Sequence, residues 1–518
     1  MLHAAKQKAF LLPQHDVRHV PLTAFSKYKL LQYAGAPHVA VPDDLATCRA
    51  LAHFGVNVPS GITRDYNWSG PWTPFKHQLQ TADFMVRNPR SFVFNDIGTG
   101  KTMAALWAID YLQSIGDMGK VLISCPMSVM DSVWGDMLFM HFPHLSYEIL
   151  HGTKQQRLDR LYSGADVFII NHDGCKVITE ELKQAPFITT VVIDELAVMR
   201  NYSTDVTKTH DIIAGAKSGR KCWGLTGSPA PNKPTDVWAQ ASIVNPKVVP
   251  KYFTRFREQV MKKVSMYQWV PRRGWERTLF SMVQPSIRFK REDCLDLPPC
   301  TTINKKVKLS KDQAKAYKDL KTECLTELRN GAEISAANEA VKLNKFLQIS
   351  AGYVYDSDGV GHALPCADKI KVMLESVEEA GGKAIVYTPF RATLQPLVNV
   401  LEKRGYRVRQ IHSGVKASTR ADIFRNFQAE DSDIDVIVSI PGCIRYGVNL
   451  TASNSIINWS GIDDYDVYSQ AMGRITRAGQ TKPQTIINLT ASPAEEKVCA
   501  RNERKEKLQG ILLELLEN

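Results

Sequence analysis

The chain has 518 residues, 44% of them hydrophobic and 23% charged, which is typical of a globular protein with several domains and a sizeable core. Its 65 basic and 53 acidic residues give a formal net charge of +12, which favours polyanionic partners. No stretch reaches the ~18 consecutive apolar residues of a membrane span, and the N-terminal stretch lacks the apolar run of a signal peptide. The ten cysteines are scattered without Cys-x-x-Cys spacing, which argues against zinc. We therefore expect a soluble intracellular protein.

Residues 1–70 are expected to form a small accessory segment. The alternating stretch at 38–41 predicts a strand, and residues 43–54 predict a short helix behind an aspartate cap. Basic residues in this segment could contact nucleic acid, although a solvated basic face is the simpler interpretation. Prolines and glycines between residues 59 and 74 then mark a linker.

Residues 71–245 and 366–490 each alternate near-continuous apolar stretches with helical segments. The first region has expected strands at 92–94, 121–125, 167–170, 191–193 and 222–225, and the second at 384–387, 408–411, 436–439, 455–458 and 485–488. Because continuous apolar strands separated by helices are buried on both faces, each region predicts a parallel sheet covered by helices. The predicted fold class is therefore α/β, with two parallel-sheet lobes.

Residues 246–365 interrupt this alternation and are expected to form a basic, aromatic and helical insertion between the lobes. The stretch from 251 to 291 holds 11 lysines and arginines against 2 glutamates, so most of the net charge lies there. Residues 308–350 are expected to be helical. Residues 491–518 predict a charged helix with Ser492 as its cap and Pro493 at its first position.

The stretch SFVFNDIGTGKT at 91–102 runs from an apolar strand through a glycine loop into the start of a helix. That order suits a loop that holds nucleotide phosphates with backbone N–H groups at a helix N-terminus. Lys101 would reach the β- and γ-phosphates, and the Thr102 hydroxyl would ligate Mg²⁺. The other loop positions expected to bind nucleotide are Asp96, Gly98, Thr99 and Gly100. The full pattern has a glycine in place of Asn95, and the alternative is a glycine turn with a surface lysine.

Two further groups of charged residues suit nucleotide hydrolysis. Asp194 and Glu195 end a buried strand, where one carboxylate would hold hydrated Mg²⁺ and the other would orient or deprotonate water; the alternative is a cap. Arg474 and Arg477 lie three apart on an expected helix and would share one face. A guanidinium delivered from outside the phosphate loop stabilises charge on the γ-phosphate, whereas the alternative is a solvated basic helix.

Nine segments in order resemble those of the SWI/SNF-type DNA translocases of helicase superfamily two, over about residues 71–510. In the first lobe they are HQLQTADFM, similar to the glutamine motif, NDIGTGKT, similar to DEMGLGKT, VLISCPMSVMDSVW, similar to motif Ia, IDELAVMRN, similar to DEAHRIKN, and LTGSPAPNKPTDVWAQ, similar to LTGTPIQNNLEELWSL. RFKREDCLDLPP resembles the LRR-K-dLPP segment. In the second lobe they are IHSGVKASTRADIFRNF, YGVNLTAS and QAMGRITRAGQTKP, the last being the most specific. In NDIGTGKT, Asn95 replaces an aspartate of the family, and the missing glycine is normal for it.

The resemblance implies two RecA-like lobes that hydrolyse ATP, with Mg²⁺, in the cleft between them and move along double-stranded DNA. It implies that Gln78 recognises adenine, that Gly447 contributes to nucleotide binding, and that Gln470, Arg474 and Arg477 complete the catalytic site. The implied DNA contacts are Ser128, His412, Ser413, Gly414, Ser439 and Asn449, with Lys262, Lys263, Arg272 and Arg273 of the basic insertion. Ala197 stands where the family has a histidine that helps link the ATP site to the DNA-bound state.

Three functions of different classes fit these features. The first is a translocase that moves on duplex DNA and remodels or displaces DNA-bound partners. The second is a strand-separating helicase for branch migration or fork unwinding, which would carry a wedge hairpin or accessory domain, and the sequence shows no pattern for one. The third is a non-catalytic DNA-binding scaffold, against which the intact charged residues argue. The compact chain resembles bacterial and phage versions, so we expect a cytoplasmic location, or a nuclear one in a eukaryote.

Overall fold

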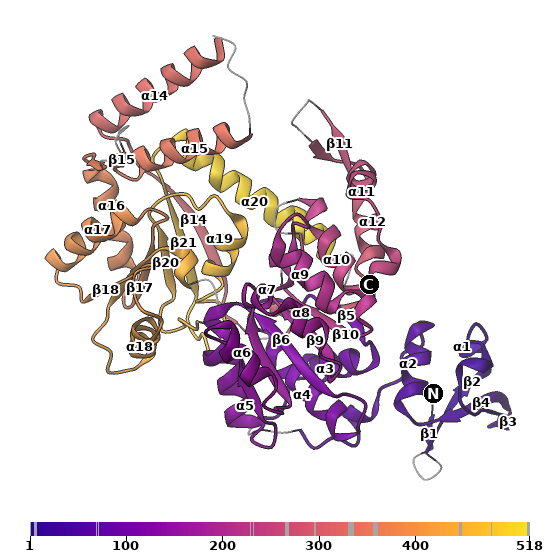
Figure 1. Ribbon diagram of the computed structural model, residues 1–518. Coiled ribbons are helices and arrows are strands. Elements are labelled where there is room, and N and C mark those ends of the chain that lie inside the picture. The colour runs from indigo at the N-terminus through magenta and orange to yellow at the C-terminus, as the bar shows by residue number, and fades with distance from the viewer. Residues whose placement is uncertain are drawn as a thin grey trace.

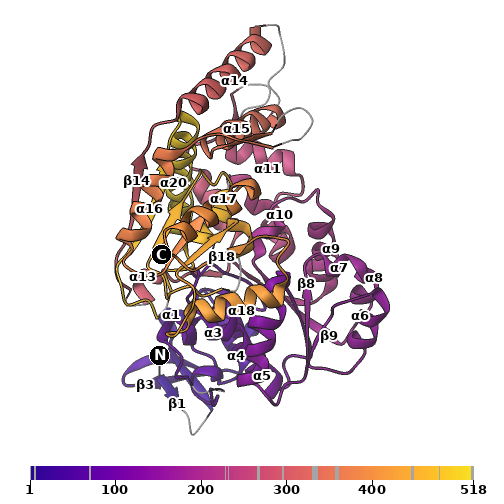
Figure 2. The ribbon, with the colours of Figure 1, turned by 90° about the vertical axis from the view of Figure 1, so that its left-hand side faces the viewer.

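The computed structural model describes residues 2–4, 8–68, 70, 72–227, 229–230, 233–264, 269–294, 297–329, 336–355, 361–444, 448–477 and 479–514. Figure 1 shows a small N-terminal unit in indigo, a first α/β lobe in purple and a second α/β lobe in orange and yellow. In Figure 2 the N-terminal unit and helix α14 (Lys311–Arg329) lie at opposite ends of the molecule. The two lobes confirm the predicted fold class. None of the helices in the described ranges is long and apolar enough to cross a membrane.

The N-terminal unit is a four-stranded antiparallel sheet with its own core. Its strands lie in the order β1 (Leu2–Ala4), β2 (Ala9–Pro13), β4 (Ala36–Pro42) and β3 (Lys29–Tyr33), beside helices α1 (Gln14–Val17) and α2 (Leu45–His53). Phe10 of β2 and Leu51 of α2 both lie in this core. Asp44 caps α2, because its side chain accepts a hydrogen bond from Thr47 N at 2.7 Å. These elements confirm the expected strand and the aspartate-capped helix.

Lobe one is built on a seven-stranded parallel sheet. In spatial order its strands are β13 (Ser286–Ile287), β5 (Arg90–Val93), β10 (Lys221–Leu225), β9 (Ile188–Asp194), β6 (Lys120–Cys125), β8 (Val167–Asn171) and β7 (Tyr147–Ile149). The five central strands are the predicted ones. The edge strands β7 and β13 are not predicted, because each is very short and only partly buried and therefore lacks a continuous apolar run.

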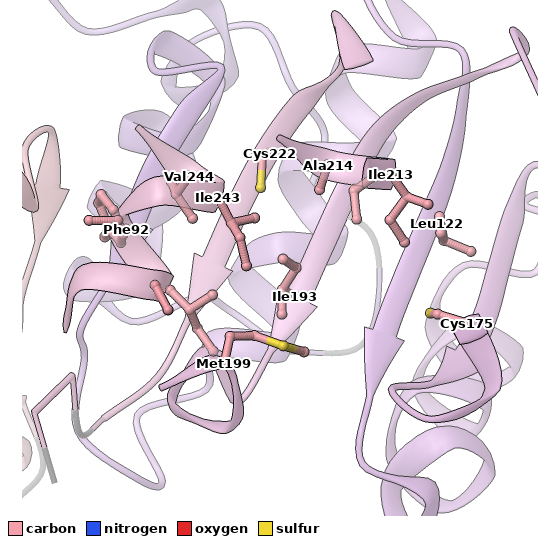
Figure 3. Close-up of a cluster of buried hydrophobic side chains, with 14 of the residues drawn as sticks. Phe92, Leu122, Cys175, Ile193, Met199, Ile213, Ala214, Cys222, Ile243 and Val244 are labelled. Atoms are coloured by element: carbon pink, nitrogen blue, oxygen red, sulfur yellow. The ribbon is translucent and has the colours of Figure 1, made fainter. Parts of the chain in front are cut away.

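Helices bury both faces of this sheet. One face carries α3 (Lys76–Arg87), α4 (Lys101–Ser114) and α5 (Asp136–His141). The other carries α6 (Lys154–Leu161), α7 (Gly174–Val177), α8 (Thr179–Lys183), α9 (Asp205–Ala214) and α10 (Val237–Val244). Figure 3 shows Ile243 of α10 near Ile193 of the sheet and Ile213 of α9 near Leu122. This packing holds the ends of β5 and β9 in fixed positions.

Lobe two contains a six-stranded parallel sheet. In spatial order its strands are β14 (Cys300–Lys306), β21 (Gln484–Thr490), β20 (Ser455–Asn458), β17 (Ala384–Tyr387), β19 (Val436–Ser439) and β18 (Val408–Ile411). Its helices include α15 (Ala336–Ser350), α16 (Ala367–Glu379), α17 (Arg391–Lys403), α18 (Ala417–Gln428), α19 (Tyr465–Met472) and α20 (Pro493–Glu514). Four predicted strands have the predicted bounds, and β21 is longer. Strand β14 is not predicted, because its side chains are mostly polar and exposed.

The region 246–365 is shared between the lobes and is not a separate insertion. Helices α11 (Phe253–Val260) and α12 (Trp275–Met282) flank a hairpin of β11 (Met261–Lys263) and β12 (Trp269–Pro271). Both helices contribute to the core of lobe one, whereas β13 joins the first sheet and β14 the second. The lobes therefore extend beyond the expected bounds 71–245 and 366–490.

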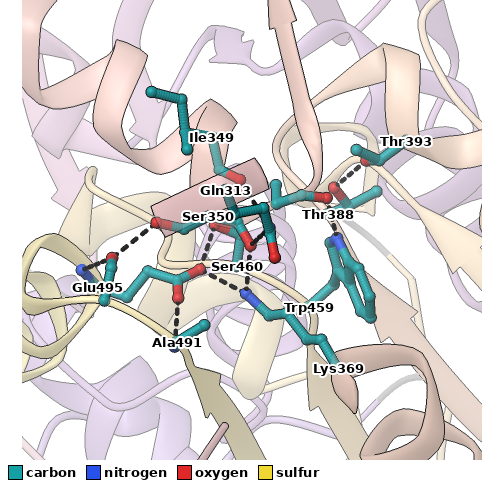
Figure 4. Close-up of polar contacts among 12 residues, drawn as sticks. Gln313, Ile349, Ser350, Lys369, Thr388, Thr393, Trp459, Ser460, Ala491 and Glu495 are labelled. Atoms are coloured by element: carbon teal, nitrogen blue, oxygen red, sulfur yellow. Dashed lines mark hydrogen bonds and ion pairs between the residues drawn. The ribbon is translucent and has the colours of Figure 1, made fainter. Parts of the chain in front are cut away.

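Helix α20 is anchored inside lobe two by a buried ion pair. Ser492 Oγ accepts a hydrogen bond from Glu495 N at 3.3 Å, which confirms the predicted cap. The Glu495 side chain is 0% exposed and its Oε1 lies 2.7 Å from Lys369 Nζ of α16. Ser460 Oγ at 2.8 Å and Ala491 N at 2.7 Å donate to the same carboxylate, as Figure 4 shows. Further along, α20 contacts α12 of lobe one.

The substitution Lys369→Met is expected to lower the free energy of unfolding of lobe two by about 3–5 kcal/mol. It would leave the Glu495 carboxylate buried without a counter-charge and would remove the donor to Ser350 O at 3.1 Å. Urea denaturation followed by circular dichroism measures this loss. The matched control is Lys371→Met, which removes an exposed lysine from the same helix and should change little. Equal stability of the two variants would contradict the prediction.

Candidate active site

The predicted phosphate loop joins β5 to α4 and depends on two glycines. Gly98 (φ 88°) and Gly100 (φ 79°) adopt the left-handed conformation that glycine favours, and Gly100 is the N-cap of α4. A side chain at position 100 would collide with Gln78 Nε2. Within the described ranges no side-chain hydrogen bond caps α4, so its first N–H groups remain for an anion. The loop therefore fits the phosphates of a nucleotide.

Lys101 begins α4 at the base of the loop. Its Nζ donates to the carbonyl oxygens of Asn95 at 2.8 Å and Asp96 at 3.0 Å. Burial lowers the pKa of Lys101, while the carboxylates of Glu195, Asp194 and Asp96 oppose this shift. The ammonium group is thus held inside the loop, close to both carboxylates of the second predicted motif.

Asp194 ends β9, and Glu195 follows it. Trp134 Nε1 donates to Asp194 Oδ2 at 2.9 Å, and Thr226 Oγ1 donates to Glu195 Oε1 at 3.0 Å. Burial raises the pKa of Asp194, and the bond from Trp134 opposes the rise. Glu195 has φ 59° and ψ 55°, a left-handed conformation that costs a residue with a side chain about 1–2 kcal/mol. The Asp194 carboxylate and the Thr102 hydroxyl are hard oxygen ligands, so this donor set fits Mg²⁺.

Gln78 of α3 lies at the edge of the same loop. Its Nε2 donates to Thr99 O at 3.4 Å, and its Oε1 accepts from Phe75 N at 3.0 Å. The ring of His77 contacts Thr99 O at 2.9 Å. The structure therefore brings the residue predicted to recognise adenine to the phosphate loop.

Asn95, which departs from both the general pattern and the family motif, has a structural role. Its Nδ2 donates to Thr81 Oγ1 at 2.8 Å, and its Oδ1 accepts from Phe289 N at 3.0 Å. Because Thr81 gives its own hydroxyl proton to His77 O at 2.7 Å, it can only accept from residue 95. An amide supplies the required donor and acceptor, whereas a carboxylate supplies acceptors alone. The amide thus joins α3 to the segment that follows β13.

Arg474 and Arg477 do not lie on a helix, contrary to the prediction. Helix α19 ends at Met472 with a glycine as its C-cap, so both arginines stand in the turns beyond it. Arg474 is 3% exposed, and its Nε donates to Gln470 O at 2.8 Å. Arg477 reaches lobe one, because its Cγ lies 3.4 Å from where a Cβ on Gly98 would be. Burial lowers the pKa of Arg477, and the neighbouring charges of Arg474 and Arg291 lower it further.

Gln470, another residue predicted for the site, lies within lobe two. The Gln470 side chain is buried and donates to Asp466 Oδ1 at 3.0 Å. Gly447 lies outside the described residues. Ala197 is buried in the turn after Glu195, and Arg200 beyond it approaches Asp466 at 4.0 Å. The segment without the motif histidine therefore still contacts lobe two.

The predicted DNA contacts differ in exposure. Ser128, Ser413, Gly414 and Asn449 are exposed and His412 is half-buried. Lys262, Lys263, Arg272 and Arg273 are all exposed and belong to the β11–β12 hairpin or adjoin it. Ser439 is 0% exposed, because it ends the buried strand β19, and its Oγ donates to Ile440 O at 3.0 Å. The Ser439 side chain is therefore not placed where DNA could contact it.

The sequence analysis misses three groups that shape the site. Trp134 and Thr226 orient the two carboxylates, and Arg288 Nη1 donates to Asp96 Oδ1 at 3.0 Å. Thr226 lies in the LTGSP segment, whose resemblance points to it. Trp134 ends the VLISCPMSVMDSVW segment and Arg288 begins the RFKREDCLDLPP segment, but no spacing in the sequence indicates that they contact Asp194 and Asp96.

One parallel-sheet lobe carries the predicted phosphate loop and two carboxylates, and the other lobe brings an arginine against that loop. This arrangement is typical of a nucleotide-hydrolysing enzyme of the helicase type. Residues 77–351 match the SNF2-related domain, and residues 368–479 match the helicase conserved C-terminal domain. The chain therefore belongs to the SNF2-related family and is a DNA-dependent ATPase.

Several known proteins are similar to this chain. The chain is 24% identical over 473 residues to putative protein p41 of Acyrthosiphon pisum secondary endosymbiont phage 1, covering 86% of this chain and 99% of that protein. It is 24% identical over 457 residues to the chromodomain-helicase-DNA-binding protein 1-like of Danio rerio, covering 83% of this chain and 42% of that protein. The chain thus spans less than half of this larger relative. The Sulfolobus solfataricus SWI2/SNF2 ATPase core in complex with dsDNA is 21% identical, with a TM-score of 0.41 and coverage of 87% and 97%.

Proposed function

We propose that this ATPase is a motor that tracks along double-stranded DNA and displaces or remodels what is bound there. The observation that carries the proposal is the position of Arg477 of lobe two against Gly98 of lobe one. A catalytic arginine supplied by the opposite lobe makes hydrolysis depend on closure of the cleft. Closure and opening in each ATP cycle can then be converted into movement along a bound polymer.

In the proposed site, lobe one binds the nucleotide and lobe two stabilises charge that develops during hydrolysis. Lys101 binds the β- and γ-phosphates, and Glu195 takes a proton from the attacking water while Thr226 fixes its carboxylate. Arg477 and Arg474 supply positive charge from lobe two. Mg²⁺, held by Thr102 and Asp194, would neutralise phosphate charge, and Gln78 would recognise adenine.

The proposed DNA path uses exposed turns on both lobes. Lobe one offers Ser128 after β6, and lobe two offers Ser413 and Gly414 after β18 and Asn449. Contacts of this kind position a phosphate backbone and carry no base information, which suits movement along any sequence. Movement follows if the two lobes hold the duplex alternately.

The test compares ATPase turnover without nucleic acid, with single strands and with duplex, beside displacement of the third strand of a DNA triplex. We expect duplex to stimulate turnover most and ATP to drive third-strand displacement. A turnover that duplex does not stimulate, or stimulated turnover without displacement, would contradict a duplex-tracking motor.

We expect weaker binding, by an equal amount across DNA sequences, when neutral residues replace Lys262, Lys263, Arg272 and Arg273. The plot of log affinity against log salt should flatten by about one unit for each lost phosphate contact. Fluorescence anisotropy with labelled duplexes at several salt concentrations measures the slope. The control replaces Lys176, Lys183 and Lys208, exposed lysines of lobe one paired with nearby carboxylates, and should keep the slope. An unchanged slope in the hairpin variant would mean that this surface does not bind DNA.

A strand-separating helicase is the second candidate, and one observation favours it. The β11–β12 hairpin projects from lobe one beside α11 (Figure 1), although the sequence shows no pattern for a wedge. Its strands are three residues long and β11 carries two lysines, so the hairpin gives no alternating apolar signal. Unwinding of a forked duplex, without third-strand displacement, would favour this function over the motor.

A further inference from the structure

The segment that connects the two sheets is fixed to the start of the phosphate loop. It runs beside the residues that follow β5, with Phe94 N donating to Ile287 O at 2.8 Å and Asp96 N donating to Phe289 O at 3.0 Å. The Asn95 side chain accepts from the same segment, as described above. The start of the phosphate loop therefore fixes the position of the connecting segment as far as residue 291.

Arg291, at the end of this fixed stretch, contacts both sides of the cleft. Its backbone N donates to Asp96 Oδ2 at 3.0 Å in lobe one. Its Nη1 donates to Thr476 O at 3.1 Å in lobe two. Thr476 is buried and stands immediately before Arg477 in the chain. One residue thus connects the phosphate loop to the main chain that carries the predicted catalytic arginine.

The contact between Arg291 and Thr476 counteracts the repulsion between neighbouring arginines. Arg291 lies close enough to Arg477 for its charge to contribute to the lowered pKa of that arginine, and Arg474 contributes in the same sense. Like charges in a partly desolvated cleft repel each other, so the arginines need neutral or negative partners to stay together. The carbonyl of Thr476 gives Arg291 such a partner and at the same time holds the residue next to Arg477.

We infer that Arg291 is a positioning residue that sets Arg477 against the phosphate loop by binding the carbonyl of Thr476. This inference rests on the proposed ATP site and names a residue through which closure of the cleft is communicated. Arg291 does not contact the nucleotide in this account. Its loss should therefore reduce the rate of hydrolysis and spare the affinity for nucleotide and DNA.

The test is Arg291→Met, which removes the guanidinium and keeps the backbone N–H that binds Asp96. The kcat with duplex DNA is expected to fall about tenfold, the effect of losing one charged hydrogen bond in the transition state. The KM for ATP, the Kd for ADP and the Kd for DNA should stay within about twofold. The matched control is Arg160→Met, which removes another partly buried arginine that donates to carbonyls, those of Ile149 at 2.8 Å and His151 at 3.1 Å, within lobe one. The control should keep wild-type kcat.

A double variant separates positioning from direct contact. If Arg291 acts through Arg477, Arg291→Met should cost little more in an Arg477→Lys background, where residual hydrolysis is measured at enzyme excess. The inference would be overturned if the losses of kcat in the two single variants multiplied in the double variant. It would also be overturned if Arg291→Met raised the KM for ATP, weakened the affinity for ADP or had the same kcat as Arg160→Met. Wild-type turnover is the reference in every case. An enzyme that hydrolyses ATP without displacing a third strand would overturn the motor and leave this test intact.

Discussion

Replacing Arg477 with lysine is expected to lower DNA-stimulated ATP turnover about a thousandfold or more while DNA binding persists, and Arg477→Ala should be at least as severe. Arg477 lies on Gly98 of the phosphate loop, in a cleft where burial strengthens electrostatic interactions. Lysine keeps the positive charge and loses the planar fork that can bind two phosphate oxygens at once. Because this interaction acts on charge that develops in the transition state, nucleotide affinity should change little.

Steady-state ATPase assays with saturating duplex, together with fluorescent-nucleotide and DNA titrations, test the Arg477 prediction. The control is Arg425→Lys on α18, because Arg425 forms an exposed ion pair with Asp422 at 2.7 Å and such pairs contribute little. Normal hydrolysis by Arg477→Lys on duplex DNA would mean that the interlobe site is wrong.

Glu195→Gln is expected to bind ATP with near-normal affinity and to hydrolyse it about a hundredfold or more slowly, because it removes the proposed general base. The amide can keep the acceptor for the Thr226 hydroxyl, so the local structure should be preserved. Rapid-quench measurement of bound ATP separates binding from hydrolysis. Near-wild-type turnover would exclude Glu195 as the base.

Lys101→Ala provides the contrasting variant for the Glu195 prediction. It should abolish hydrolysis and weaken nucleotide binding as well, because it removes the ammonium from the phosphate site while leaving the fold intact. Two loop carbonyls, those of Asn95 and Asp96, would lose their donor. A variant that binds and hydrolyses ATP normally would show that the loop does not hold phosphates.

Much of the fold is predictable because the central strands carry continuous apolar runs. Strands β17, β19 and β20 have the predicted bounds, since each lies inside the sheet and is fully buried. The edge strand β18 also has the predicted bounds, with its first and last residues buried. Edge strands such as β14 have one open side, and the polar residues tolerated there remove the signal. Strand β13 is too short for any periodicity.

The candidate site is predictable where one local segment contains the chemistry. The phosphate loop and the Asp194–Glu195 pair are of this kind, because strand, turn and functional group follow each other directly in the chain. The turn that carries Arg477 resembles a continuation of α19, and only the structure shows that the helix stops at Met472. Contacts such as that of Trp134 with Asp194 join residues far apart in the sequence, and no local pattern records them.

The attachment of α20 to both lobes limits how the molecule can move. Its first turn is fixed in lobe two by Glu495 and Lys369, and its later part contacts α12 of lobe one. The connecting segment at 288–300 is the second crossing between the lobes. A rigid body attached at two separate points turns most easily about the line through both. The cleft would therefore open by rotation about this single axis. A small rotation near the ATP would then become a larger displacement at the surfaces farthest from the axis.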